Sequence, residues 1–423
     1  MRTDGTGGSN PGGFTTHSDV YVSNDHMYFR GTDDKVWRVR TDGTGGSNPG
    51  GFTTHSNVQV FGDSMYFRGT DDKVWRFDFS EGTLRDFATA ALETLQGWYS
   101  WDNGLWDYSQ WLGVWHGGGG WWFSANALNA NIDFMSITRS SGYLTVVTNT
   151  FDKNKDHNFT QKADVYDDEG WWALTWINAY DLTKDQRYLQ MAETIFNDMK
   201  LGWDNTCGGG VWWKKDKEYK NAITNELFMA IAIRLYQRTS TAEYLTWALD
   251  EWAWFQKSGM INTNNLVNDG LDNTCKNNQG PTFTYNQGVI LRGLSDLYAV
   301  RQDQTYLTVA QQIADSAINT LVNRDGILTE PCEPTNSCTD NGNDPVQFKG
   351  VFIRNLAYLS KFTAKPSYKI FTYNNALSVL HNDRSLSNEL GLRWSGPFDS
   401  ADSIRQSSAL DALNAGMIVN GTD

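Results

Sequence analysis

The sequence predicts a mainly α-helical protein, a toroid of six helix pairs written (α/α)6, preceded by a small all-β tandem repeat. Two observations lead to this fold class. From residue 79 onward, apolar residues recur at helical spacing in one segment after another. Before that point, one stretch of the chain occurs twice in succession and carries short apolar runs between turn residues. We therefore expect two domains, residues 1–78 and residues 79–423.

The first domain consists of two nearly identical repeats, residues 2–39 and 40–77. In the first repeat, Gly, Asn and Asp residues separate β-rich runs at Val20–Val22, Met27–Arg30 and Val36–Val39. This pattern is typical of a four-stranded propeller blade or a related β-repeat, and it resembles the blades of tectonin-like and other lectin-like propellers. Two blades cannot close a ring or cover their edge strands. We therefore expect either assembly with copies from other chains or a place in a longer array.

Two functions are open for these repeats. Trp37 and Trp75, with nearby polar residues, are candidates for binding glycans, while packing in the blade core is an equally good interpretation. Self-association through the repeats is the second function. The near-identity of the two copies indicates a recent duplication or engineering, and the sequence does not separate these.

The second domain repeats a helical hairpin. An amphipathic helix is followed by a short polar turn and by a second helix that opens near a tyrosine. These tyrosines are Tyr143, Tyr188, Tyr244, Tyr306 and Tyr368. The helices that precede them are Ser124–Arg139, Trp171–Asp181, Ala222–Thr239, Tyr285–Arg301 and Phe348–Phe362. Leu84–Leu95 at the start and Ser403–Met417 at the end bring the total to about twelve helices in six pairs. Long Trp-, Gly- and Asn-rich segments gather at one end of the pairs, which favours a closed toroid with a cleft over an open solenoid.

The net charge of −14 and the pI near 4.9 argue against a nucleic acid or an anionic membrane as the partner, because phosphates would be repelled. A neutral glycan remains compatible with this charge. The sequence has no membrane-spanning run and no signal peptide. Because Met1 opens directly into a repeat, we expect that a targeting segment has been removed and that the protein is secreted.

The four cysteines also point to an oxidising compartment. Cys332 and Cys338 bracket a short loop, and Cys207 and Cys275 each follow an Asp-Asn-Thr triplet in loops that could meet, so we expect two disulfides. No CxxC pair or nearby histidine favours metal binding instead, and we predict neither a metal nor a cofactor. Glycosylation sequons at residues 158–160 and 420–422 agree with secretion.

Two neighbouring carboxylates, Asp167 and Asp168, lie at or just before the start of an apolar helical run. Helix capping is the ordinary explanation for such residues. The surrounding Trp and Gly residues instead favour sugar cleavage, which requires two carboxyl groups about 5 Å apart for a retaining mechanism. Helix N-terminal amides would keep one carboxylate ionised, while aromatic neighbours would hold the proton on the other. Glu169 and Glu226 are rival acids of lower rank.

The segment Tyr166–Trp172 resembles the Asp-Asp motif of glycoside hydrolase family 76, the endo-α-1,6-mannanases and their fungal cell-wall relatives. Further stretches resemble the family in the same order: Trp121–Leu128, Gly208–Trp213, Lys220–Phe228, Thr284–Gly288 and Gln347–Gly350. The resemblance covers about residues 80–418 and implies an (α/α)6 barrel, with Asp167 as nucleophile and Asp168 as acid/base. By matching position, the candidates for substrate binding are Asn126, Trp172, Trp213, Asn225, Tyr285, Asn286 and Gln287.

The resemblance implies a retaining endo-hydrolase that cleaves α-1,6-mannan or mannooligosaccharides through a covalent glycosyl-aspartate. A transglycosidase of the same family, which passes the glycosyl group to another sugar, is the nearest alternative. The transglycosidases at fungal walls usually carry a lipid-anchor signal, and no apolar tail follows Met417 here, which favours hydrolysis. A glycan-binding protein with an inactive helical domain is the alternative from a different class, and the intact Asp167–Asp168 pair argues against it.

Overall fold

The structure is a computed structural model. It describes residues 21–23, 26–30, 36–40, 59–61, 64–68, 74–78, 81–100, 112–117, 121–157, 159–160, 164–339 and 344–421.

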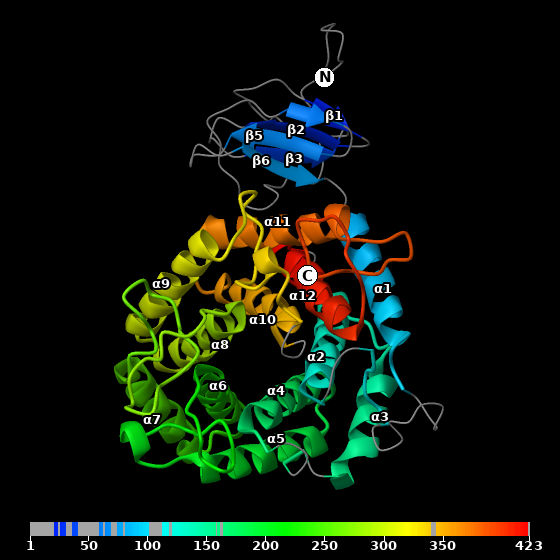
Figure 1. Cartoon of the computed structure of the whole chain (residues 1–423). Coiled ribbons are helices and arrows are strands. Elements are labelled where there is room, and N and C mark those ends of the chain that lie inside the picture. Colours follow the sequence, from blue (N-terminus) through cyan, green and yellow to red (C-terminus); the bar gives the residue numbers. More distant parts are fainter. Residues whose placement is uncertain are drawn as a thin grey trace, which may run out of the picture.

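The described residues form twelve α-helices arranged as two concentric rings (Figure 1). The inner ring consists of α2 (Trp121–Thr138), α4 (Tyr166–Thr183), α6 (Ala222–Thr239), α8 (Thr284–Arg301), α10 (Asp344–Leu359) and α12 (Ser403–Asn420). The outer ring consists of α1 (Glu81–Gln96), α3 (Leu144–Asn154), α5 (Gln186–Met199), α7 (Ala242–Ser258), α9 (Gln304–Thr320) and α11 (Pro366–Asn382). Each inner helix packs against the next inner helix along the chain, and α12 packs against α2. The predicted toroid of six helix pairs is confirmed.

The sequence of each helix explains its layer. In the outer helix α5, the buried residues Tyr188, Leu189, Ala192, Ile195 and Phe196 recur every three or four positions, so one stripe faces the inner ring. In the inner helix α12, nearly every residue is buried, because this helix is surrounded on all sides.

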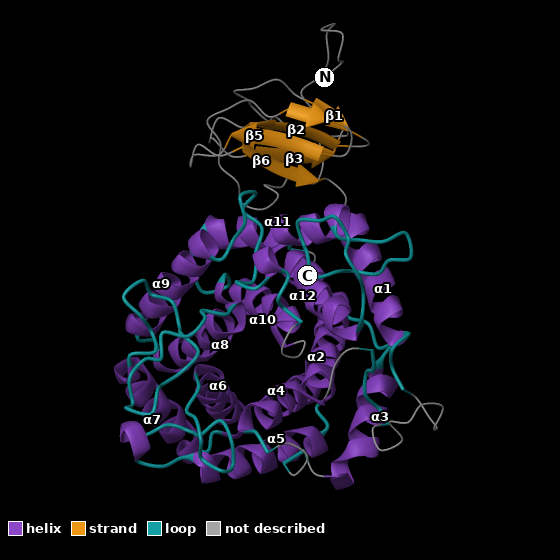
Figure 2. Ribbon diagram, in the orientation of Figure 1, coloured by secondary structure: helices purple, strands orange, loops and turns teal. Residues whose placement is uncertain are grey.

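The connections differ in length at the two ends of the ring. Each inner helix joins the following outer helix by a short link, such as residues 184–185, 240–241 and 302–303. Each outer helix returns to the next inner helix by a long segment, such as residues 200–221, 259–283 and 383–402. The long segments therefore gather where the inner helices begin (Figure 2). Within them lie the short 3-10 helices η3 (Lys200–Gly202), η4 (Thr206–Gly208) and η5 (Glu333–Thr335), while η2 (Lys155–His157) extends α3.

The two N-terminal repeats contain six strands in the described residues. They are β1 (Tyr21–Ser23), β2 (His26–Arg30), β3 (Val36–Arg40), β4 (Gln59–Phe61), β5 (Ser64–Arg68) and β6 (Val74–Asp78). They form two antiparallel sheets in the orders β1-β2-β3 and β4-β5-β6, and the register is the same in both, with Phe29 opposite Trp37 and Phe67 opposite Trp75. The predicted β-rich runs are thus present. A fourth strand in each repeat would fall outside the described residues, so the likeness to a propeller blade stays a prediction.

Glycines allow the inner helices to approach closely. A Cβ atom added at Gly350 of α10 would lie 2.7 Å from both the Cα and the carbonyl oxygen of Ser408 in α12. A Cβ atom at Gly288 of α8 would lie 2.7 Å from the Cα of Phe352 in α10. These are backbone atoms, which cannot move aside as a flexible side chain can. The spacing of α8, α10 and α12 therefore depends on the missing side chains.

We expect Gly350→Ala to destabilise the protein by about 1–3 kcal/mol, because the added methyl group would push α10 away from α12. Urea denaturation followed by tryptophan fluorescence measures this change. Gly142→Ala is the matched control, since its added Cβ atom would meet only the Ser140 hydroxyl, at 3.7 Å. Equal stability of the two variants would contradict the close-packing argument.

Candidate active site

A cleft of about 340 Å³ opens at the end of the ring where the inner helices begin. Its walls come from the first turns of α2, α4, α8 and α10 and from the long segments between helices. Asp167, Asp168, Trp213 and Tyr285, four of the residues predicted to form the site, line this cleft together.

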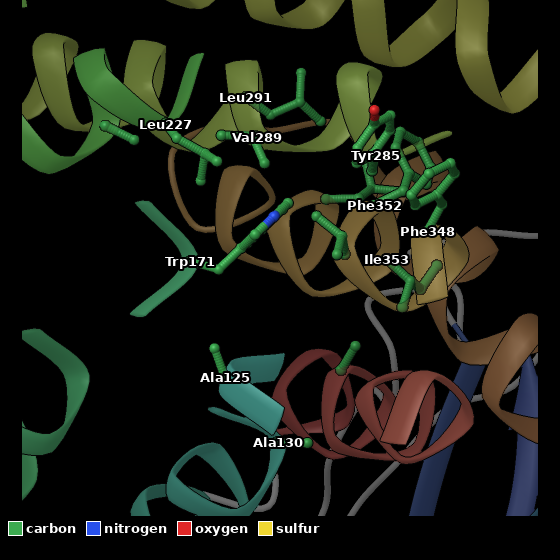
Figure 3. Packing of buried hydrophobic residues seen from close by; sticks show 14 of the residues in the cluster. Ala125, Ala130, Trp171, Leu227, Tyr285, Val289, Leu291, Phe348, Phe352 and Ile353 are labelled. Carbon is green, nitrogen blue, oxygen red and sulfur yellow. The ribbon is translucent and has the colours of Figure 1, made fainter. Parts of the chain in front are cut away.

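Aromatic rings form the floor of the cleft. Trp122 and Trp171 are stacked with ring centroids 5.6 Å apart, and Tyr285 and Phe348 are stacked at 3.7 Å. Trp171 is also stacked with Tyr285 at 6.5 Å. Figure 3 shows Trp171 pointing toward residues of α8 and α10 in the centre of the ring. Such faces suit the C–H side of a pyranose ring and exclude water from the carboxylates above them.

Asp167 lies in the first turn of α4 and receives several hydrogen bonds. Its Oδ1 accepts from the Asp168 amide at 3.0 Å and from Trp213 Nε1 at 3.2 Å, while its Oδ2 accepts from Asn221 Nδ2 at 3.5 Å. Burial raises the pKa of Asp167, and the donors from Asp168 and Asn221 oppose this rise. The ionised carboxylate is therefore the form that these donors stabilise.

Asp168 has a different environment on the next residue of the same turn. Within the described part of the chain, no side chain or amide donates a hydrogen bond to its carboxylate. Burial, and then the negative charges of Asp167 and Asp344, raise the pKa of Asp168 well above its ordinary value. The two carboxylates thus differ in the protonation state that their surroundings favour, since only Asp167 has donors that stabilise its ionised form.

The sequence analysis missed two further carboxylates in the cleft. Asp344, the first residue of α10, accepts from Trp122 Nε1 at 3.0 Å, and its charge raises the pKa of both Asp167 and Asp168. Asp269 accepts from the Tyr219 hydroxyl at 2.7 Å. The sequence could have indicated Asp344. Because all the inner helices begin at the same end of the ring, any acidic residue in the first turn of an inner helix is a candidate for the cleft.

Trp172 and Asn126 do not line the cleft, contrary to expectation. Trp172 follows Trp171 in α4, and one helical residue rotates its side chain by about 100° away from the cleft. It is fully buried, with ring centroids 4.6 Å from Trp121 and 5.6 Å from Trp176. Asn126 is buried below the first turn of α2, where its Oδ1 accepts from Arg354 Nη2 at 2.7 Å.

The remaining three amides are also buried away from the cleft. Asn225 binds the backbone of Val211, accepting from its amide at 2.6 Å and donating to its carbonyl at 3.0 Å. Gln287 binds Val267 in the same way, at 2.7 and 2.8 Å. Asn286 is fully buried in α8. None of these three residues lines the cleft, so a role for them in substrate binding has no support in this geometry.

The rival acids are outside the cleft as well. Glu169 is buried, and its Oε1 lies 2.6 Å from Lys215 Nζ, an ion pair on the outer side of α4. Glu226 is buried in α6, where burial raises the pKa of its carboxyl well above the ordinary value. Neither carboxylate reaches the aromatic floor.

The segment that carries Trp213 is anchored by Lys220. This side chain is 1% exposed and donates to the carbonyls of Asp204, Thr206 and Gly209 at 2.6–3.2 Å and to Asp204 Oδ1 at 3.1 Å. The disulfide Cys207–Cys275 ties the same segment to the next long connection, and Cys332–Cys338 closes a short loop. Both predicted disulfides are confirmed.

Among the residues that the structure describes, no group of three or more His, Cys, Asp or Glu side chains is arranged to hold a metal ion. None of the helices in that part of the chain is both long and apolar enough to cross a membrane.

The sequence matches Glycosyl hydrolase family 76 over residues 83–422, most of the chain. The chain belongs to this family. It is 28% identical over 267 residues to the mannan endo-1,6-α-mannosidase DCW1 of Candida albicans, an alignment that covers 57% of this chain and 58% of the relative. It is 26% identical over 323 residues to DCW1 of Saccharomyces cerevisiae, covering 69% of this chain and 71% of the relative. The chain thus spans less than two thirds of the Candida protein.

Solved structures show the same fold. An inactive variant of an α-1,6-mannanase of Salegentibacter sp. HEL1_6, with two consecutive aspartates replaced by alanine and α-1,6-mannotetrose bound, superposes with a TM-score of 0.69 at 22% identity. This alignment covers 79% of the chain described here and 99% of the mannanase chain. Dfg5 of Chaetomium thermophilum, in complex with glucosamine, gives a TM-score of 0.70 at 18% identity, covering 80% and 91% of the respective chains.

We expect Lys220→Met to destabilise the protein by about 1.5–3 kcal/mol, because it removes charge-assisted hydrogen bonds to three backbone carbonyls and a carboxylate. Denaturant unfolding measures the change. Lys361→Met, which alters an exposed lysine at the other end of the ring, is the control. Similar unfolding curves for the two variants would show that Lys220 does not hold the segment.

Proposed function

We propose that this family 76 protein is a retaining glycoside hydrolase that cleaves α-1,6-linked mannan internally. The observation that carries the proposal is the half-buried Asp167–Asp168 pair, which lines an aromatic cleft and has hydrogen-bond donors directed at only one of the two carboxylates. The names of the relatives support the substrate, and the inactive mannanase variant with two consecutive aspartates replaced supports the location of the chemistry.

In the first step Asp168 donates its proton to the glycosidic oxygen, and the bond from that oxygen to the anomeric carbon breaks. The Asp167 carboxylate attacks the same carbon from the opposite face and forms a covalent glycosyl-aspartate. In the second step Asp168, now ionised, removes a proton from water, and the water oxygen replaces Asp167 on the anomeric carbon. Two displacements leave the configuration at this carbon unchanged.

The same intermediate explains the nearest alternative. If a sugar hydroxyl replaces water in the second step, the protein is a transglycosidase, and the product is a longer glycan. Chromatography of the products distinguishes the two reactions, because only hydrolysis releases one new reducing end for each bond that is cut.

The N-terminal repeats remain a separate proposal. We keep residues 1–78 as a domain of propeller-like repeats that binds glycans or associates with itself, attached to the hydrolase domain of residues 79–423. The two disulfides support an oxidising compartment and hence secretion, and glycosylation at the sequons belongs to the same proposal.

We expect Asp167→Asn and Asp168→Asn each to lower kcat on α-1,6-mannan by at least about 100-fold, since one removes the nucleophile and the other the proton donor. Reducing-end release measures the rate, and proton NMR of the first products of the unaltered enzyme should show the α configuration. Asp325→Asn, in an exposed hairpin turn, is the control. Activity of both cleft variants equal to that of the control would remove the catalytic assignment.

The pH profile of kcat/KM tests the electrostatics of the cleft. The charge of Asp344 raises the pKa of both Asp167 and Asp168, so Asp344→Asn should lower both pKa values. The acidic limb follows ionisation of Asp167 and the alkaline limb follows loss of the Asp168 proton, so both limbs should move to lower pH. The asparagine oxygen can still accept from the Trp122 indole. A profile that stays in place or moves to higher pH would contradict this account.

A further inference from the structure

A second groove lies on the outside of the ring, between α7 and the segment that follows α5. Its volume is about 490 Å³, and its main lining residues are Trp203, Trp247, Asp250, Trp254 and Lys257. Four of these are in α7 at positions spaced by three or four residues, so they form one stripe along that helix. The fifth, Trp203, comes from the opposing segment.

Three indole rings border the groove at steep angles to one another, and of these Trp254 is buried while Trp203 and Trp247 are half-buried. The Trp203 centroid is 5.5 Å from that of Trp247 and 6.3 Å from that of Trp254, with interplanar angles of 69° and 67°. Trp247 and Trp254 are two helical turns apart, which corresponds to about 10.5 Å along α7. This length is suited to a short run of sugar units rather than to a single small molecule.

Hydrogen bonds fix two of the rings by their edges. Trp254 Nε1 donates to the Cys207 carbonyl at 3.0 Å, and Trp247 Nε1 donates to Glu243 Oε1 at 3.3 Å. Gly209 and Gly210 make room for Trp254, since added Cβ atoms would lie 2.8 and 2.4 Å from its ring. The aromatic walls of the groove are therefore preorganised.

The groove also presents free polar groups. Asp250 and Lys257 are exposed, and within the described residues neither side chain has a hydrogen-bond or ion-pair partner. One carboxylate and one ammonium group give the groove no net charge, in a protein whose overall charge of −14 disfavours anionic ligands. Aromatic faces beside a few unpaired donors and acceptors match a neutral glycan.

One segment of chain runs from the groove to the cleft. Residues 203–221 begin at Trp203, pass the disulfide at Cys207, and reach Trp213 and Asn221 in the cleft. Lys220 lies near both sites, since its Nζ is 5.9 Å from the Trp254 centroid and its neighbour Asn221 contacts Asp167. The same short segment therefore carries residues of both the groove and the cleft.

We propose that this groove is an auxiliary binding site for a second stretch of the mannan chain that is being cleaved. The inference rests on the proposed function for the identity of the glycan. Binding at two linked places raises the apparent affinity for a polymer, while an oligosaccharide too short to reach both gains nothing.

The test compares polymeric α-1,6-mannan with α-1,6-mannotetraose as substrates. Trp247→Ala and the double variant Asp250→Ala/Lys257→Ala should raise KM for the polymer about fivefold, with kcat for the polymer and both constants for the tetrasaccharide unchanged. Trp247→Phe, which keeps an aromatic face, should restore most of the polymer affinity. Leu386→Ala, at an exposed apolar residue outside the groove, is the control.

Polymer constants that stay at the control value in both the Trp247→Ala and the double variant would overturn the proposal, as would constants that change equally for both substrates. Retardation of the intact protein in gels containing α-1,6-mannan separates this result from failure of the proposed function, because it requires no cleavage. Loss of retardation in Trp247→Ala and the double variant supports the groove even if mannan is not cleaved, and unchanged retardation overturns it.

Discussion

The packing of α12 against α2 is the contact on which the rest of the structure depends, because it closes the inner ring. Since inner and outer helices alternate along the chain, the six inner helices of the closed ring run in one direction, with their N-termini and the long connections at one mouth. Helix N-termini stabilise negative charge, and the first turns of α4 and α10 supply Asp167, Asp168 and Asp344. The gathering of carboxylates in one cleft is thus a consequence of ring topology. Gly350, which lets α10 reach α12, contributes to the site although it is far from the chemistry.

Part of the difference between the two neighbouring aspartates comes from outside their helix. Tyr166 donates its amide to the Trp213 carbonyl at 2.8 Å, and the Trp213 indole returns a hydrogen bond to Asp167. Trp213 therefore fixes both the start of α4 and one of its carboxylates. Lys220 and the Cys207–Cys275 disulfide in turn hold the segment that carries this tryptophan. A buried cation and a covalent bond thus hold in place the segment that supplies one of the donors to Asp167.

Periodicity and turn residues were sufficient to predict the twelve helices, since α6 begins and ends where the apolar pattern does, at Ala222 and Thr239. The Asp-Asp pair was also placed correctly in the first turn of an inner helix. The amides were not, because sequence does not tell which partner an amide will have. Asn225, Gln287, Asn375 and Gln406 each bind the backbone of a short hairpin between helices, at Val211, Val267, Leu328 and Leu390. Amide side chains therefore recur in these helices because they bind the hairpins, and in the sequence that recurrence was interpreted as a sugar-binding pattern. Trp172 was predicted to bind substrate, but it is Trp171 that lines the cleft. Adjacent residues of a helix point in different directions, and the sequence alone does not show which of the two faces the cleft.

Trp171 borders the cleft and also a second cavity of about 240 Å³ at the opposite end of the ring, where Arg234, Arg292 and Arg354 lie. One indole is thus shared by a compartment lined by carboxylates and a compartment lined by arginines. A smaller side chain at this position would enlarge both compartments at once, so a change made for one end of the ring would also reshape the other.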